Sequence, residues 1–297
     1  MKRFAAAIAG VLLSFCWTTA SGADTDAAPA AATAPSAQPA VRRVGDAFDY
    51  TIHGSMTQAI TARSPLGGSV RQPGTPTQLQ GSEHVAVQQV GDQNITLKRS
   101  GHIVAVVSDK SIKSAGRGQT IVRDDGSIAH DTGNLGGVFL LPLPFLGEKA
   151  MNDGADLAVG TRWTDKLGTK LYGMTARPMM TFEVTAQHLM LGLDVFEIVA
   201  QGSAPMKEPI VSNTGESLGY AIGTAHVTIR GQYDHVNHRM VAMDVEVQDQ
   251  LKLAGAVPHA AGTVGDNQHY VLELDPASLA ASSSQQDAMP IVLPVTH

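Results

Sequence analysis

The chain contains a single cysteine, Cys16, which lies close to the N-terminus. Phe15 precedes it, at a place where lipid attachment favours a small residue, so we do not expect a lipoprotein. Cleavage after Ala23, which the neighbouring residues favour, would remove Cys16. We therefore expect a mature chain that has neither a disulfide nor a thiolate nucleophile.

A surplus of basic residues is also missing. The chain has 21 Lys and Arg against 27 Asp and Glu, a formal net charge of −6. Removing Lys2 and Arg3 with the N-terminal segment leaves 21 − 2 = 19 basic residues and a net charge of −8. Nucleic acids and anionic membranes attract clustered Lys and Arg, so we expect neither as a partner.

The first residues have the three parts of a secretory signal peptide. Two basic residues follow Met1, an apolar run extends over 4–16, and small residues stand at Ser21 and Ala23. The apolar run is too short for an ordinary membrane-spanning helix. We therefore predict a signal peptide over 1–23, a periplasmic or secreted protein, and no membrane span in the mature chain.

Two further segments are poor in bulky apolar residues. Residues 24–43 are nearly all Ala, Pro, Thr and Ser, and 276–297 is a similar low-complexity tail with an apolar stretch at 290–294. Such segments bury too little surface to offset the entropy lost on ordering. We predict a disordered linker and a tail that flank a folded body of roughly 230 residues.

The clearest periodicity lies in 241–253. Every odd position except Asp249 is apolar, and the even positions from 244 to 252 are charged or carry an amide. A period of two predicts a β-strand with one dry face and one wet face, which is typical of antiparallel sheets. Its length of about 40 Å favours a curved sheet or an open barrel over a flat sandwich.

Weaker alternation recurs along the rest of the chain, and turn-forming residues separate the alternating segments. The alternating segments are 48–52, 180–187, 226–230 and 270–274, and the turns are 90–94, 124–126 and 234–238. Turns placed in this way join the arms of β-hairpins. Long helical patterns are missing. The sequence therefore predicts an all-β, mostly antiparallel protein that forms a curved sheet, an open barrel or a sandwich.

Three short matches occur twice in the same order. They pair Val-Gly-x-x-aromatic at 44–48 with 159–163, the hairpin arms 95–101 with 196–202, and Gly118-Gln-Thr120 with Gly231-Gln-Tyr233. We interpret them as a tandem duplication of about 110 residues. This gives one β-module over 44–135 and a second over 159–275. The alternative is that β-hairpins resemble one another without common origin.

Between the modules, residues 136–158 form an apolar strap and linker. Pro142 and Pro144 exclude a central strand and disrupt a helix. An apolar, extended segment of this kind is a plug across the core, a lid over a ligand cavity or an exposed docking surface. We favour the plug.

The second module resembles a group of exported bacterial β-proteins known as domains of unknown function. The likeness covers roughly 140–275 and rests on the Leu/Pro-rich segment, on Val159-Gly-x-x-Trp163 and on the later run 193–198. The group usually has Val-Gly-Asp-x-Trp. Asp46 keeps the acid but Phe48 replaces the Trp, whereas the second copy keeps Trp163 and has Thr161 for the Asp. The resemblance implies a β-fold and export, and no activity.

Gly215-x-Ser217-x-Gly219 has the spacing of a serine-hydrolase nucleophile elbow. That elbow needs a strand before the serine and a helix after it, in an α/β protein. Two glycines and a strand-like segment follow Ser217 instead, so we interpret the motif as a loop.

Histidine and methionine raise the alternative of a metal site. His226, His235 and His238 are candidate zinc or copper ligands, and methionines gather in the second module. His235 and His238 fall on a predicted turn, where Asp, Asn and His are ordinary residues. Met180 and Met243 fall on dry strand faces, where Met fills gaps. We therefore expect no metal ligands and no cofactor.

The remaining candidates have structural explanations. Asp244 and Glu246 lie on the wet face of the long strand, so we expect solvated carboxylates rather than an acid–base pair. Trp163 stands at a strand start, where we expect it to anchor the core. We assign no catalytic residues and no ligand-binding residues.

Together these features predict an exported protein of unknown function that is not an enzyme. It would be a binding or structural β-scaffold, for a hydrophobic small molecule or for an envelope protein. The alternative is a periplasmic hydrolase or a zinc- or copper-binding protein that uses Ser217 or the three histidines.

Overall fold

A computed structural model of the protein describes residues 44–63, 69–107, 110–123, 127–132, 157–171, 173–211, 217–235, 239–254 and 261–278. The predicted signal peptide, the predicted linker, residues 136–156 of the strap and residues 279–297 of the tail lie outside them. Among the described residues, no helix has the length and apolar character needed to cross a membrane.

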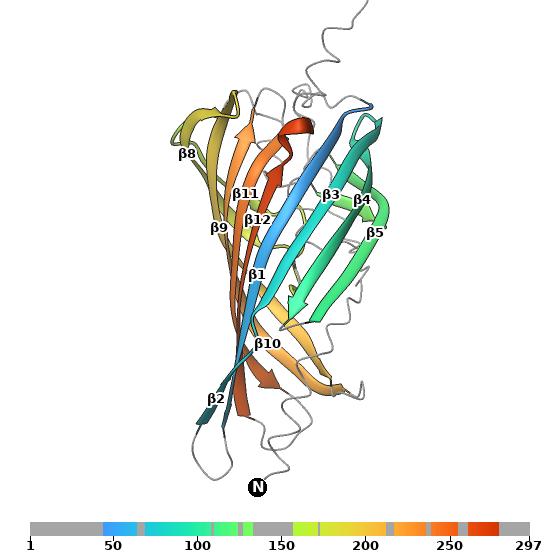
Figure 1. The fold of residues 1–297 in the computed structure, drawn as a ribbon. Coiled ribbons are helices and arrows are strands. Elements are labelled where there is room, and N and C mark those ends of the chain that lie inside the picture. Colours follow the sequence, from blue (N-terminus) through green and yellow to red (C-terminus); the bar gives the residue numbers. More distant parts are fainter. Residues whose placement is uncertain are drawn as a thin grey trace, which may run out of the picture.

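In the described part of the chain, twelve strands form one antiparallel sheet, which confirms the predicted fold class (Figure 1). The sheet order is β6-β5-β4-β3-β1-β12-β11-β10-β9-β8-β7, and β2 pairs with β1 off this path. The strands are β1 (Ala47–Arg63), β2 (Ser69–Pro73), β3 (Thr77–Val90), β4 (Asn94–Val107), β5 (Lys110–Arg123), β6 (Ile128–Asp131), β7 (Arg162–Lys166), β8 (Met179–Met190), β9 (Leu193–Val211), β10 (Ser217–Asp234), β11 (Arg239–Ala254) and β12 (Ala261–Leu274).

The alternation predicted for 241–253 is present in β11. Its odd residues are buried from Val241 to Leu251, and its even residues from Ala242 to Ala254 point the other way and are partly or fully exposed. Asp249 is buried with the apolar residues of the dry face. We call the face that carries the odd residues of β11 the inner face of the sheet, and the opposite one the outer face.

The sheet curls about its long axis (Figure 1). Leu167 and Leu171, which follow β7, belong to the interior, because they join the same buried cluster as Val245 of β11. That cluster also contains Ile52 of β1 and Ile103 of β4, from the first half of the sheet. Among the described residues β6 and β7 do not pair with each other. The Ile128 N–H, in β6, donates to the Gly168 carbonyl, just after β7, at 3.3 Å, which links the two ends of the sheet.

The predicted turns join hairpin arms. β3 and β4 pair on either side of 91–93, and β10 and β11 pair on either side of 235–238. β9 and β10 are longer than the alternation in their sequences predicts. β9 continues through Pro205 and Pro209, although prolines usually exclude a strand. The N–H of Lys207 points away from β10 and donates to the Gly173 carbonyl. Pro205 and Pro209 have the same parity as Lys207, so no hydrogen bond to β10 is lost at the prolines.

The two Val-Gly-x-x-aromatic segments have the same local geometry. Gly45 has φ 100° and Gly160 has φ 91°, a left-handed conformation that favours glycine. The Gly45 N–H donates to the Val87 carbonyl, and the Gly160 N–H donates to the Val184 carbonyl. In return, the N–H of Val87 donates to the Asp46 carbonyl, and the N–H of Val184 donates to the Thr161 carbonyl.

The strands that follow these segments also match in register. Val87–Leu97–Thr120 are neighbours across β3, β4 and β5, as Val184–Ile198–Gly231 are across β8, β9 and β10. Register shifts follow Val87 and Val184 in the two halves. This register matches Thr120 with Gly231, so the sequence match of Thr120 with Tyr233 was displaced by two residues.

Trp163 anchors the core, as predicted. Its ring stacks on Phe182 with centroids 5.0 Å apart and planes 5° from parallel. Trp163→Ala is expected to lower the free energy of unfolding by about 3–5 kcal/mol, because a large buried ring leaves a cavity. Urea denaturation measures the loss. Val159→Ala, at an exposed position nearby, is the control and should change stability by less than about 0.5 kcal/mol.

Candidate functional site

Three carboxyl groups lie on the inner face, among residues that are otherwise mostly apolar. Glu208 is on β9, Asp249 on β11 and Asp266 on β12. Asp249 and Asp266 are direct cross-strand neighbours, and Asp266 is in turn opposite Gln58 of β1. Asp249 and Asp266 are 8% and 5% exposed. We call Glu208, Asp249 and Asp266 the carboxyl cluster.

Hydrogen bonds satisfy only part of this cluster. The Asp266 main-chain N–H donates to Asp249 Oδ1 at 3.1 Å, and Gln58 Nε2 donates to Asp266 Oδ2 at 3.4 Å. One oxygen of each acid is buried and has no hydrogen-bond partner: Glu208 Oε1, Asp249 Oδ2 and Asp266 Oδ1. Buried acceptors without donors are uncommon in folded proteins and call for an explanation.

Burial raises the pKa of all three acids. Desolvation is the main cause for each, and it brings the pKa of Glu208 to about 7, of Asp249 to about 6 and of Asp266 to about 7. Repulsion among the acids adds to the shift, since Asp249 raises the pKa of Asp266 and both aspartates raise that of Glu208. The cluster therefore changes its charge around neutral pH.

Apolar residues border the carboxyl cluster. In the next inward-facing row, Ile60, Val264 and Leu251 are neighbours across β1, β12 and β11. Ile60 and Leu253 are only partly buried and pack against the edge of the core. On the β9 side, Gly173 approaches Glu208 so closely that a Cβ there would lie 2.5 Å from Oε1. The surroundings therefore combine hydrogen-bond acceptors with an accessible apolar surface.

The carboxyl cluster presents buried hydrogen-bond acceptors that have no donors. No group of three or more His, Cys, Asp or Glu side chains within the described part of the chain is arranged to hold a metal ion. A cationic N–H donor beside Asp249 and Asp266, which are cross-strand neighbours, would donate to their unpartnered oxygens and offset the repulsion between them.

A second buried charged group lies in the first half of the sheet. Arg99 of β4 donates through Nε to Glu83 of β3, and through Nη1 to Thr120 at 3.1 Å and to Asp131 at 3.2 Å. Arg99 and Glu83 side chains are each 1% exposed. Desolvation raises the pKa of Glu83 to about 7, although Arg99 opposes the shift. Arg99 Nη2 has no hydrogen-bond partner. We call these four residues the arginine network.

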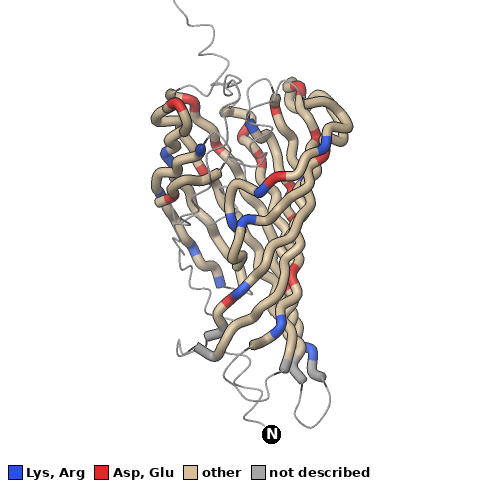
Figure 2. The backbone as a smooth tube through the Cα atoms, turned by 180° about the vertical axis from the view of Figure 1, so that it is seen from behind, with Lys and Arg blue, Asp and Glu red and all other residues tan. Residues whose placement is uncertain are grey.

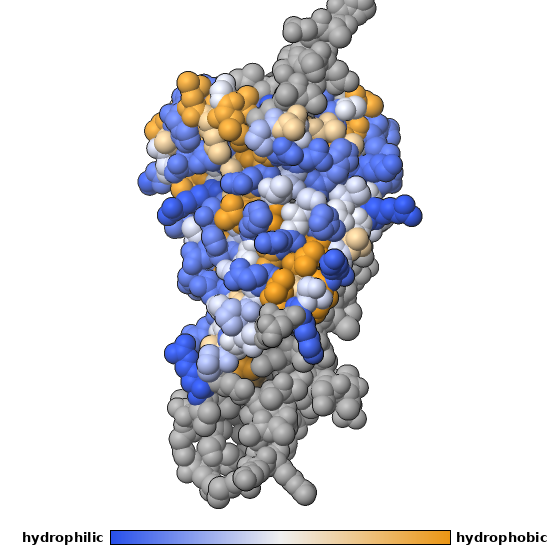
Figure 3. Space-filling view, in the orientation of Figure 1, coloured by the Kyte–Doolittle hydropathy of each residue, from blue (hydrophilic) through white to orange (hydrophobic). Residues whose placement is uncertain are grey.

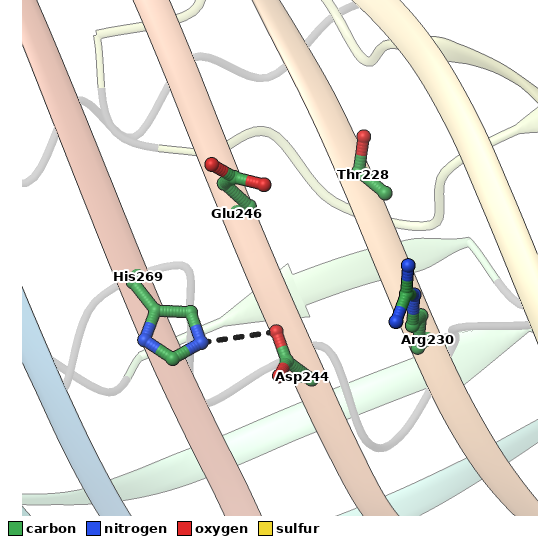
Figure 4. A pocket seen from close by; sticks show the side chains of 5 residues that line it. All are labelled: Thr228, Arg230, Asp244, Glu246 and His269. Carbon is green, nitrogen blue, oxygen red and sulfur yellow. Dashed lines mark hydrogen bonds and ion pairs between the residues drawn. The ribbon is translucent and has the colours of Figure 1, made fainter.

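The outer face carries a shallow polar hollow (Figure 4). His269 and Asp244 point toward each other, with His269 Nε2 3.1 Å from Asp244 Oδ1. Thr228, Arg230 and Glu246 complete its lining. Hydrophilic residues cover much of the face seen in Figure 3, with apolar residues between them. Because both members of the His–Asp pair are about half exposed, solvent screens their interaction.

Of the residues that the hydrolase and metal alternatives would use, His226 and His235 do not come together. Ser217 is the first residue of β10, and its side chain lies outside the described part of the structure. His226 is exposed in the same strand, and His235 follows it, with its ring 4.7 Å from that of Phe196. Nine residues of strand separate these histidines by about 30 Å, so they cannot share an ion. His238 lies outside the described residues.

A serine–histidine pair that the sequence did not suggest lies on the outer face. Ser82 Oγ and His102 Nδ1 are 3.1 Å apart on β3 and β4. Both strands pair with neighbours on each side there, so their main-chain N–H groups are engaged in the sheet. An oxyanion hole needs free N–H donors beside the nucleophile, and this location offers none from the strands themselves.

Sequence reasoning missed the carboxyl cluster, although one signal pointed to it. Asp249 is the only interruption on the dry face of the most regular strand. Asp266 and Glu208 lie in segments with no comparable alternation to make them stand out.

No known protein family matches the chain, and no curated protein matches it either. The likeness to exported bacterial β-proteins therefore stays a prediction, and the function is argued from the site alone.

Proposed function

We propose that this chain is an exported, non-catalytic binding protein whose inner face takes an amphipathic amine. The carboxyl cluster would hold the ammonium group, and the apolar residues beside it would contact the tail. The observation that carries the proposal is the set of three buried carboxyl oxygens without hydrogen-bond donors.

The fold gives no reason for acids at these positions. Neighbouring inward positions on the same strands hold Val247, Leu251 and Val264, which are buried and apolar. Burying a carboxylate without full compensation costs several kcal/mol. Groups that lower stability in this way cluster at binding and catalytic sites.

A primary ammonium matches the cluster in charge and in donor number. It carries three N–H donors and no acceptor, and three acceptor oxygens lack donors here. An anionic headgroup would repel the ionised acids. An uncharged hydroxyl would satisfy fewer of the oxygens and would leave the repulsion in place.

The apolar border supports an amphipathic rather than a fully polar ligand. Ile60 and Leu253 flank the acids and keep part of their surface accessible. An alkyl chain laid on them would bury apolar surface at about 25 cal/mol per Å². Binding sites commonly combine an apolar wall with a few polar groups that fix orientation.

Dodecylammonium is a suitable probe, and dodecanoate is its charge-reversed control. At pH 8, dodecylammonium at about one hundred times its Kd should raise the free energy of unfolding by about 2.7 kcal/mol. Dodecanoate should have no comparable effect. Thermal unfolding and calorimetry at concentrations below micelle formation measure both.

Affinity should also depend on pH and on the acids. Lowering the pH from 8 to 5 protonates acids whose pKa is about 6–7 and should weaken amine binding at least tenfold. Asp249→Asn/Asp266→Asn should weaken it similarly at pH 8, whereas Asp244→Asn on the outer face should not. Equal binding of dodecanoate, or equal loss with Asp244→Asn, would contradict the proposal.

We also infer that the two halves of the sheet derive from one duplicated unit. The matched glycine conformations, registers and register shifts support this. In that register Glu83, Arg99, Thr120 and Asp131 correspond to Met180, Ala200, Gly231 and Met243. Three of the counterparts are buried and uncharged, so the arginine network is not a requirement of the repeated unit.

A further inference from the structure

Among the described residues, strand β5 is paired along its whole length on one side only. It pairs with β4 from Lys110 to Arg123, whereas β6 pairs only with Thr120–Val122. Gln119 bonds to Thr132 beyond that. Within the part of the chain that the structure describes, residues 110–118 have no strand on their second side.

This open edge is long enough to accept another strand. In an antiparallel ladder alternate residues direct both the N–H and the C=O to the same neighbouring strand. About four residues of 110–118 therefore direct these groups to the side where β5 has no partner. Lys110–Lys113, Ala115 and Arg117 are exposed. Unpaired edges of this kind are templates for strand addition.

The charge of the edge selects its partner. Lys110, Lys113 and Arg117 lie within the open stretch, which has no acidic residue, although the whole chain carries a net charge of −6. Lys and Arg positions follow one another on the left of Figure 2, the side on which β5 lies. Two copies paired through this edge would place cations against cations, which disfavours a second copy as the occupant.

The two faces of β5 specify the pattern further. Thr120 and Val122 are buried on the inner face of the sheet. Because alternate residues share a face, Ile112 also lies on the inner face, whereas Lys113 and Arg117 lie on the outer face. Ile112 is 56% exposed, and the glycines at 116 and 118 place no side chain on its face. A complementary strand therefore has acids on one face and an apolar residue on the other.

We propose that the open edge of β5, residues 110–118, binds an extended acidic segment of a partner protein as an added antiparallel strand. Acidic side chains of the partner pair with Lys113 and Arg117, and an apolar side chain covers Ile112. This site is separate from the carboxyl cluster and does not depend on the proposed amine.

A nine-residue peptide of alternating Glu and Val, labelled with a fluorophore, tests the proposal by anisotropy at low salt. We expect saturable binding. Lys113→Glu/Arg117→Glu should weaken it at least tenfold, because it reverses both charges that face the acids. Lys252→Glu is the matched control, since β11 has partners on both sides, and it should change affinity less than twofold.

Two peptides methylated at alternate main-chain nitrogens separate strand addition from simple charge attraction. Strand addition uses the N–H groups of one parity only, so one methylated peptide should lose at least tenfold in affinity and the other less than threefold. Asp249→Asn/Asp266→Asn should leave peptide binding unchanged.

Absence of saturable binding overturns the proposal, as does equal binding of both methylated peptides or of a Lys–Val peptide. Dimerisation of the unliganded protein that Lys113→Glu/Arg117→Glu abolishes would also overturn it, because the occupant would then be a second copy.

Discussion

Asp266→Asn is expected to raise the free energy of unfolding at pH 8 by about 2–4 kcal/mol. Burial raises the pKa of Asp266 from 3.8 to about 7, so at pH 8 the folded protein holds a charged group that it stabilises poorly. Each unit of pKa shift corresponds to about 1.4 kcal/mol. The amide removes the charge, and its N–H groups face Asp249, the cross-strand neighbour, which has an oxygen without a donor.

The same argument fixes the pH dependence of the wild-type protein. The folded state holds more protons than the unfolded state wherever the folded pKa is the higher one. Stability from the cluster is therefore fully present below about pH 4 and is lost as the pH rises through about 6–7. In Asp266→Asn this fall should be smaller by the amount gained at pH 8.

Urea denaturation at pH 5 and pH 8 provides the measurement. Asp244→Asn, at a half-exposed carboxylate on the outer face, should change stability by less than about 0.5 kcal/mol at either pH. A loss of stability in Asp266→Asn at pH 8 would show that Asp266 is well stabilised as a carboxylate, contrary to our account of the cluster.

Arg99→Met is expected to lower the free energy of unfolding by about 3–5 kcal/mol at pH 8. The substitution leaves the Glu83 carboxylate buried without its cation, and removing one partner of a buried ion pair has a cost of this size. The loss should be smaller at pH 5, because the pKa of Glu83 is already about 7 and rises further without Arg99.

Replacing the whole network should be far less harmful than removing the arginine. Glu83→Met/Arg99→Ala/Thr120→Gly/Asp131→Met installs the residues of the second half, where the same positions pack without charges. We expect a change between about −1 and +4 kcal/mol in stability, since apolar replacement of buried ion pairs is often neutral or stabilising. A loss above about 3 kcal/mol would refute the structural equivalence of the halves.

Alternation made part of this fold predictable. The period of two in 241–253 identified β11 and its dry face, and turn residues located the hairpins at 91–93 and 235–238. The ends of β9 were harder, because prolines usually exclude strands. Pro205 and Pro209 are tolerated because their nitrogens point away from β10, on the side of β9 that extends past the start of β8 at Met179.

The carboxyl cluster depends on contacts between distant segments. Asp249 was visible as an interruption in a regular strand, yet nothing local associated it with Glu208, Asp266 or Gln58. Asp249, Asp266 and Gln58 meet because β12 pairs with both β11 and β1, which joins the two ends of the described chain in one sheet.

The amino-acid sequence alone determined that the alternating segments are extended, which side of 241–253 is dry and where the chain turns at 91–93 and 235–238, because these properties follow from the spacing of neighbouring residues. The tertiary structure decided which strands lie side by side. Strand pairing joins residues that are as many as 274 − 50 = 224 positions apart, namely Tyr50 and Leu274, and no local pattern encodes that choice. The buried acids and the open cationic edge both result from it.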